Sequence, residues 1–175
     1  NNFSLYKVKY ELYLYENGEF KFHEMDFGSF PNAEAHLARK TLVGDFDNDG
    51  DPDFYSANFG IDFGNYETEK SFFIINNYNV DGTFGYKENP HMEGSHEASS
   101  GDIDNDGDLD IVVSLTTSDQ DNFYQYYYLQ ILINNGDRTF TDRTEIIDHN
   151  FGDGPFYRTR IHDICLLYTS DAADD

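Results

Sequence analysis

The chain has 175 residues, 17% of them aromatic, which is enough for a sizeable hydrophobic core. Acidic residues outnumber basic ones by 34 to 11, so the formal net charge is −23, which argues against binding to nucleic acid or to anionic membrane surfaces. No apolar run reaches the roughly 18 residues of a membrane span, so we predict no membrane insertion. Cys165 is the only cysteine, and no intrachain disulfide can form.

The N-terminal region predicts a β-hairpin. Residues 6–15 and 19–25 alternate between polar and apolar side chains, as strands do, and Asn17-Gly18 between them is typical of a type I′ turn. This hairpin corresponds to the second half of a four-stranded unit. Because Asn1 is also not a start residue, we expect that the N-terminal part of the protein is missing.

Two acidic loops follow, GDFDNDGDPDF at residues 44–54 and GDIDNDGDLDI at residues 101–111. In both, Asp occupies loop positions 1, 3, 5, 7 and 9, and Gly occupies position 6. Like charges about 4 Å apart repel by roughly 1 kcal/mol in water, and a hard divalent cation reverses that repulsion. Calcium takes about 6–8 oxygen ligands in irregular geometry, and Gly at position 6 permits the sharp turn around it.

Two other interpretations of these loops are weaker. A solvated acidic turn would explain one such loop, but two loops with the same spacing, each before an apolar run, favour a metal site. An EF-hand needs Glu at position 12 and flanking helices. Position 12 is Ser56 in the first loop and Val113 in the second, and residues 111–113 are β-branched, which predicts a strand.

The pattern D-x-D-x-D-G-x-x-D followed by a strand resembles the FG-GAP, or VCBS, repeat, which also occurs in the β-propeller of integrin α-subunits. This resemblance implies that calcium is bound by the side chains at positions 1, 3, 5 and 9 and by the carbonyl at position 7. It therefore implies two Ca²⁺ sites, with these residues as ligands: Asp45, Asp47, Asp49, Asp51 and Asp53 in the first; Asp102, Asp104, Asp106, Asp108 and Asp110 in the second.

The segments between the loops also repeat. The first unit predicts strands at 39–43, 54–58, 71–76 and 83–87, and the second at 97–100, 111–115, 126–134 and 139–143. The strings NNYNVDGTF and NNGDRTF occupy equivalent places, and the two loops begin 57 residues apart, at Asp45 and Asp102. We predict an all-β fold, a partial β-propeller of four-stranded antiparallel blades with calcium-binding hairpin loops.

The predicted domain organisation follows from these repeats. Residues 1–30 form the C-terminal half of a blade, 31–89 the first complete repeat, 90–147 the second, and 148–164 the start of a third. Asp163 stands where the third loop would begin, but Cys165 breaks the pattern, and we interpret residues 165–175 as a non-native tail.

No other residues form a convincing site. The six histidines show no metal-ligand spacing, and we expect His91 and His96 in a solvated loop with Pro90. Stacked tyrosines at 124 and 126–128 would suit a sugar, but cross-strand packing explains them better. The remaining carboxylates are scattered, so no catalytic residue is predicted.

Together with these observations, the FG-GAP/VCBS resemblance implies a calcium-binding segment of a secreted or surface β-propeller, which binds a protein or carbohydrate ligand and acts in adhesion. The alternative is a non-catalytic propeller segment of a larger extracellular enzyme that degrades polysaccharide or lipid. An adjoining catalytic domain in the full-length gene would favour the alternative. We expect no enzymatic activity from the segment itself.

Overall fold

The computed structural model describes residues 8–26, 34–61, 67–118, 125–137, 139–146 and 159–161. This part of the chain is all-β, with antiparallel sheets of two to four strands, and its helical elements are the one-turn helix α1 (Tyr78–Asp81) and the 3-10 turn η1 (Thr144–Ile146). No helix within these ranges has the length and apolarity that a membrane crossing requires. The third repeat and the tail predicted from residue 148 onward lie outside the described residues, apart from residues 159–161.

The first sheet contains the four strands that the sequence predicts for the first unit. They are β5 (Ala38–Gly44), β6 (Asp53–Asn58), β9 (Lys70–Asn77) and β10 (Thr83–Glu93), which pair in the order β10-β9-β6-β5. Helix α1 connects β9 to β10, and it ends at Gly82, whose φ of 79° is the left-handed conformation that glycine adopts readily. A small hairpin of β7 (Gly60–Ile61) and β8 (Glu67–Thr68) lies between β6 and β9.

The second sheet repeats this meander. Its strands are β11 (Ser95–Gly101), β12 (Asp110–Ser118), β13 (Gln125–Asn134) and β14 (Phe140–Asp142), paired in chain order. The prediction of a loop around His91 and His96 is wrong, because β10 continues to Glu93 and β11 starts at Ser95, with only Gly94 between them. Gly94 has a φ of 70°, which permits this tight link.

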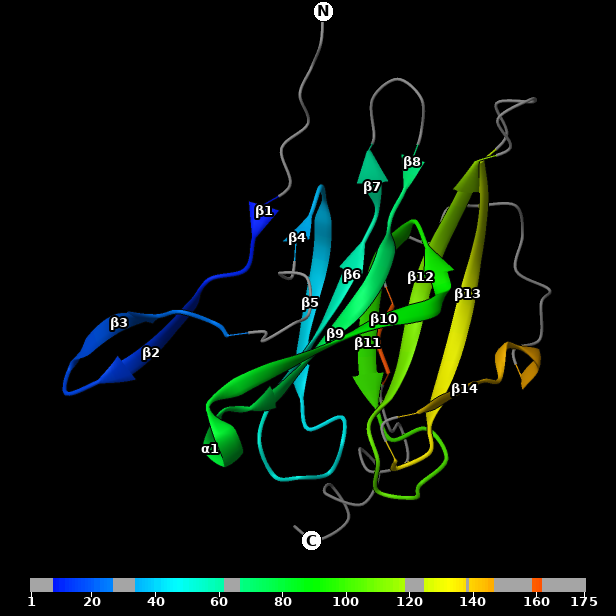
Figure 1. Ribbon diagram of the computed structural model, residues 1–175. Coiled ribbons are helices and arrows are strands. Elements are labelled where there is room, and N and C mark those ends of the chain that lie inside the picture. Colours follow the sequence, from blue (N-terminus) through cyan, green and yellow to red (C-terminus); the bar gives the residue numbers. More distant parts are fainter. Residues whose placement is uncertain are drawn as a thin grey trace, which may run out of the picture.

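The two sheets lie next to each other (Figure 1), and the hydrophobic core consists of side chains from both of them. Tyr55 and Phe73 of the first sheet are buried together with Ile111 and Leu132 of the second. The ring of Phe140 stacks on that of Phe73, with the centroids 4.9 Å apart. Each large apolar side chain buried in this way contributes roughly 1.5–3 kcal/mol to the stability of the fold. The shared core therefore stabilises the packing of one sheet on the other.

The opposite face of the first sheet packs against the N-terminal segment. Side chains alternate along β9, so Phe72 and Ile74 face this second cluster, while their neighbours face the main core. The predicted strand at residues 6–15 is interrupted here: β1 (Val8–Lys9) pairs with β4 (Glu34–Ala35), and Tyr10 turns onto the sheet. The Tyr10 ring meets Phe72 edge-on at 5.9 Å, and its hydroxyl hydrogen-bonds to Ser56.

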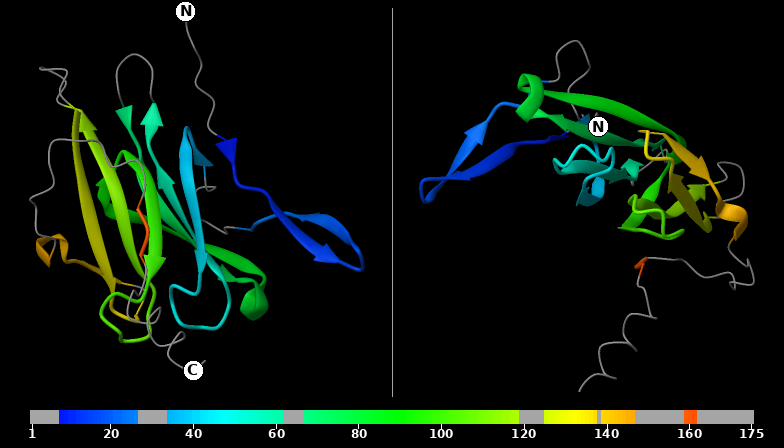
Figure 2. Two further views of the ribbon diagram at one scale, coloured as in Figure 1. Left: turned by 180° about the vertical axis from the view of Figure 1, so that it is seen from behind. Right: turned by 90° about the horizontal axis from the view of Figure 1, so that it is seen from below.

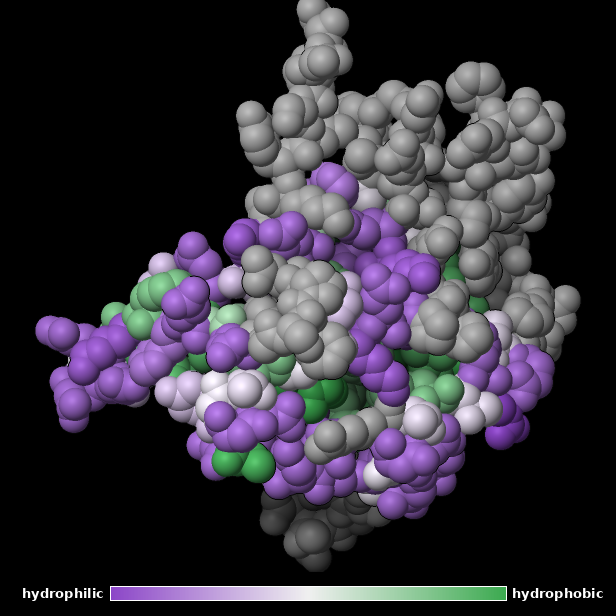
Figure 3. Space-filling view, in the orientation of Figure 1, coloured by the Kyte–Doolittle hydropathy of each residue, from purple (hydrophilic) through white to green (hydrophobic). Residues whose placement is uncertain are grey.

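The hairpin of β2 (Leu12–Glu16) and β3 (Glu19–His23) projects from the sheets (Figures 1 and 2). Its turn is the predicted Asn17-Gly18, with φ values of 52° and 91°, as a type I′ turn requires. One face carries exposed aromatic side chains in two cross-strand pairs: Tyr15 (67% exposed) with Phe20 (72%), and Tyr13 (51%) with Phe22 (58%). Figure 3 shows apolar atoms among hydrophilic ones on this hairpin.

We expect this aromatic face to cause self-association without contributing much to the stability of the fold, because its side chains contact mainly one another. Replacing Tyr15→Ser and Phe20→Ser together should reduce self-association in light scattering. The melting temperature should change little, since a cross-strand aromatic pair contributes roughly 0.2–1 kcal/mol. Val80→Ser is the matched control, because Val80 is an apolar residue 78% exposed on α1, outside the hairpin. Equal effects of the two changes on association would contradict this prediction.

Candidate metal centre

The two acidic loops lie side by side at one end of the molecule (Figures 1 and 2). Loop 1, residues 45–53, connects β5 to β6, and loop 2, residues 102–110, connects β11 to β12. Each loop therefore joins the first two strands of its sheet, and the packing of the two sheets brings the loops together.

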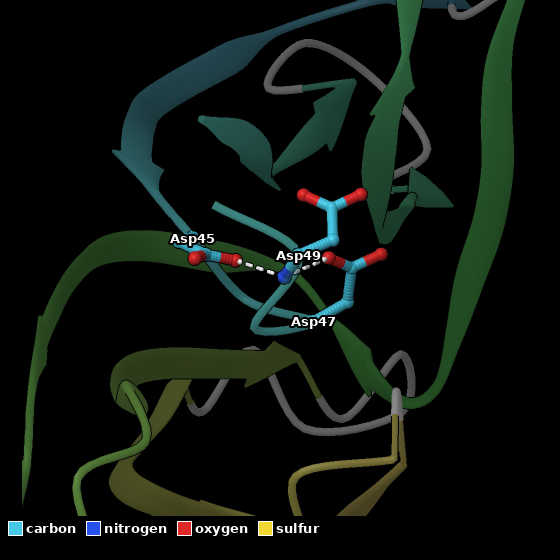
Figure 4. Close-up of side chains that lie close together, drawn as sticks. All are labelled: Asp45, Asp47 and Asp49. Atoms are coloured by element: carbon cyan, nitrogen blue, oxygen red, sulfur yellow. Dashed lines mark hydrogen bonds between the residues drawn. The ribbon is translucent and has the colours of Figure 1, made fainter. Parts of the chain in front are cut away.

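Loop 1 gathers three of its five carboxylates. Asp45, Asp47 and Asp49 each place a carboxylate oxygen within 4.8 Å of the others. The Asp49 N–H lies between the first two side chains and donates to Oδ1 of Asp45 (3.1 Å) and to Oδ1 of Asp47 (3.3 Å), as Figure 4 shows. The Gly50 N–H donates to the other oxygen of Asp45 at 2.9 Å. The backbone thus holds these side chains on the inside of the turn.

Loop 2 has the same geometry. Its cluster is Asp102, Asp104 and Asp106, again within 4.8 Å, and the Asp106 N–H donates to the first two at 3.1 and 3.3 Å. Gly50 and Gly107, at position 6, have φ values of 92° and 100°, which permit the sharp turn. Position 4 is also left-handed, with φ of 60° at Asn48 and 64° at Asn105, and asparagine tolerates this conformation better than most residues do.

Asp53 and Asp110, at position 9, are not part of the two clusters. Each carboxylate accepts hydrogen bonds from backbone N–H groups and so supports its loop. Both are fully buried. Asp53 accepts the N–H of Phe46 on one oxygen (2.9 Å) and that of Asn76 on the other (2.8 Å). Asp110 accepts the equivalent N–H groups of Ile103 (2.6 Å) and Asn134 (2.8 Å). Each carboxylate therefore ties its loop to the third strand of its sheet.

Burial raises the pKa of the Asp53 carboxyl to about 6, although the two backbone N–H groups favour its charged form. The nearby carboxylates of Asp47 and Asp49 raise this pKa further. Burial likewise raises the pKa of Asp110. Burial therefore disfavours a negative charge at position 9 of each loop.

The side chains at position 7 are hydrogen-bonded to asparagines instead of joining the clusters. Oδ1 of Asp51 accepts from Nδ2 of Asn79 in α1 at 2.8 Å. Oδ1 of Asp108 accepts from Nδ2 of Asn48 in loop 1 at 2.5 Å. If position 7 contributes to a metal site, the backbone carbonyl is the group left for that role.

The sequence interpretation did not assign a role to the asparagines that support the loops. Asn76 donates its side-chain amide to the carbonyl of Pro52 at 3.2 Å, and Asn134 donates to the carbonyl of Leu109 at 3.3 Å. These residues occupy the same place in the repeated strings NNYNVDGTF and NNGDRTF, so the repetition of Asn-Asn at the end of the third strand was the available signal.

The donor set fits a hard cation. Each cluster offers carboxylate oxygens alone, with no sulfur or imidazole, on a loop that turns through a left-handed glycine. Calcium prefers such oxygen ligands and accepts irregular geometry, whereas magnesium demands a near-ideal octahedron. Asp45, Asp47 and Asp49 in loop 1, and their equivalents in loop 2, are the residues that could hold it.

Two tandem four-stranded antiparallel sheets, each with an acidic loop between its first two strands, define an all-β repeat protein. Residues 45–113 match the family model of the FG-GAP-like repeat, the same family that the sequence pattern resembles. The match begins at the first Asp of loop 1 and ends beyond the last Asp of loop 2. No curated protein and no solved structure matches the chain significantly. FG-GAP repeats are generally non-catalytic modules and are typical of extracellular proteins.

Proposed function

We propose that this chain is a calcium-binding segment of a secreted or surface β-propeller that serves as a binding or adhesion module. The observation that carries the proposal is the pair of three-carboxylate clusters, repeated with the same hydrogen bonds in two loops. Each loop takes one calcium ion, bound by the side chains at positions 1, 3 and 5 and by the carbonyl at position 7. Asp53 and Asp110 complete the two sites.

Calcium at these loops fixes the end of each sheet and so presents a rigid surface to a protein or carbohydrate ligand. Loops of this kind in extracellular modules bind calcium with a Kd of about 10⁻⁴–10⁻³ M. Such sites fill outside the cell and stay largely empty in the cytosol, which supports the proposed location.

Calorimetric titration with calcium chloride tests the proposal, and we expect two ions per chain. Asp47→Ala should abolish the loop 1 site, because a ligand oxygen is lost from the cluster. Asp51→Asn should weaken it by much less, since the carbonyl at position 7 remains and the side chain points to Asn79. Asp104→Ala and Asp108→Asn form the same matched pair in loop 2.

Equal losses at positions 3 and 7 would contradict this coordination scheme. A titration of the unmodified chain that shows no calcium uptake would refute calcium binding altogether. The number of ions bound distinguishes the loss of one site from the absence of calcium binding, because the Asp47→Ala variant should retain one ion.

A further inference from the structure

The two acidic loops touch each other directly, although their first aspartates are 57 residues apart in sequence. One contact is the hydrogen bond from Nδ2 of Asn48, at position 4 of loop 1, to Oδ1 of Asp108, at position 7 of loop 2 (2.5 Å). Asn48 follows Asp47 and precedes Asp49, so its backbone moves with the loop 1 cluster. The bond therefore joins the conformation of one loop to that of the other.

A second contact is a buried bridge through Asn134, whose side chain is almost inaccessible to solvent. Its amide nitrogen donates to the carbonyl of Phe46 in loop 1 (3.0 Å) and to the carbonyl of Leu109 in loop 2 (3.3 Å). Its Oδ1 accepts the N–H of Gly136 at 3.1 Å, which fixes the orientation of the amide. Phe46 lies between the first two aspartates of loop 1, so one side chain positions both loops.

A third contact is apolar. Leu109 of loop 2 lies against Gly44, the residue directly before loop 1, so closely that a Cβ at Gly44 would be 2.5 Å from its Cδ1. The loops are therefore in contact through a surface hydrogen bond, a buried amide and a close-packed side chain.

From these contacts we infer that the loops bind calcium as a coupled pair, in which an ion in one loop raises the affinity of the other. This inference rests on the proposed function. Without metal, the carboxylates of each loop repel one another, so we expect each loop to be less ordered than it is with an ion bound. An ion in loop 1 fixes Asn48 and the Phe46 carbonyl, so loop 2 is already partly ordered and loses less conformational entropy when it binds.

An opposing effect is electrostatic, because the first cation removes negative charge that attracts the second. The aspartates of the loop 2 cluster and position 5 of loop 1 are solvent-exposed, and the screening length at physiological ionic strength is about 8 Å. In the proposed coupling, the ordering effect outweighs this electrostatic one. Because salt screens only the electrostatic effect, coupling should increase as salt is added.

Calcium chloride titrations of the whole chain at physiological ionic strength test the inference. In Asp104→Ala, which disables loop 2, loop 1 should bind calcium at least about 5-fold more weakly than it does when loop 2 is filled. Asp47→Ala should weaken loop 2 by the same factor, because coupling between two binding equilibria is reciprocal.

The contacts are tested by repeating this comparison in Asn48→Gly and in Asn134→Ala. The coupling factor, which is the affinity of one loop with the other loop filled divided by its affinity with the other loop disabled, should fall toward 1. Glycine removes the Asn48 side chain and still accepts the φ of 60° at this position. Asn79→Ala is the matched control, since Asn79 makes the same kind of contact, to Asp51, but within the first unit (2.8 Å). It should leave the coupling factor unchanged. Asn134 is buried, so a thermal melt must show that its variant folds, whereas Asn48 is exposed and tests the coupling independently.

The outcomes separate the two proposals. Absence of calcium uptake by the unmodified chain would overturn both the proposed function and the coupling. Two ions bound with affinities that do not depend on the other loop would overturn the coupling and leave the proposed function standing. A coupling factor that survives in Asn48→Gly and in folded Asn134→Ala would also overturn the inference, because those contacts would then not transmit it.

Discussion

Removal of calcium is expected to lower the melting temperature of the chain by roughly 5–10 °C per loop, relative to a calcium concentration of 100 Kd. A ligand that binds only the folded state at this concentration stabilises it by about 2.7 kcal/mol, and 1 kcal/mol shifts the melting temperature of a chain this size by roughly 2–4 °C. The physical source is the repulsion among the clustered aspartates, which calcium neutralises. Melting curves with excess calcium and with chelator provide the measurement.

The control is the double variant Asp47→Ala/Asp104→Ala, which lacks a cluster oxygen in each loop and should melt at the same temperature with calcium or chelator. Magnesium at equal concentration should protect the unmodified chain less, since it is reluctant to give up its water ligands. Limited proteolysis should show faster cleavage near Asn48 and Asn105 after chelation. A melting temperature that does not change when chelator is added would mean that the loops are ordinary turns.

Asp53→Ala is expected to destabilise the fold even without metal, by about 2–6 kcal/mol. The change leaves two N–H groups, of Phe46 and Asn76, without their acceptor, and a buried unsatisfied group costs about 1–3 kcal/mol. Asp110→Ala should have the same effect through Ile103 and Asn134. Urea unfolding in the presence of chelator measures the loss, with the exposed Glu19→Ala as control.

Asp53→Asn separates the two roles that position 9 can have. The amide keeps the shape and one acceptor oxygen, so a purely bracing role predicts a smaller loss that is equal with calcium and with chelator. If Asp53 also completes the metal site, the loss should be larger in calcium, because the variant then also forfeits part of the binding free energy. No difference between Asp53→Asn and the unmodified chain in either condition would contradict both roles.

The sequence alone determined the parts of this protein that depend on local rules. Asn17-Gly18 predicts its type I′ turn because both residues tolerate positive φ, and the turn forms as predicted. Alternating and apolar runs predict the strands of both sheets, and short connections make each sheet a meander. The aspartate spacing predicts where carboxylates converge, because positions 1, 3 and 5 of a tight loop lie on its inside.

Only the tertiary structure decided how equivalent-looking residues divide their roles. Five aspartates per loop are alike in sequence, but packing buries Asp53 and Asp110 under the loops, where backbone N–H groups surround them, and leaves three others clustered. The contact between the loops through Asn134 likewise depends on how the second sheet packs on the first. The N-terminal strand is interrupted at Tyr10 because the Tyr10 ring packs against Phe72, a residue far along the chain. This packing outweighs the local alternation of polar and apolar residues, which predicts one continuous strand.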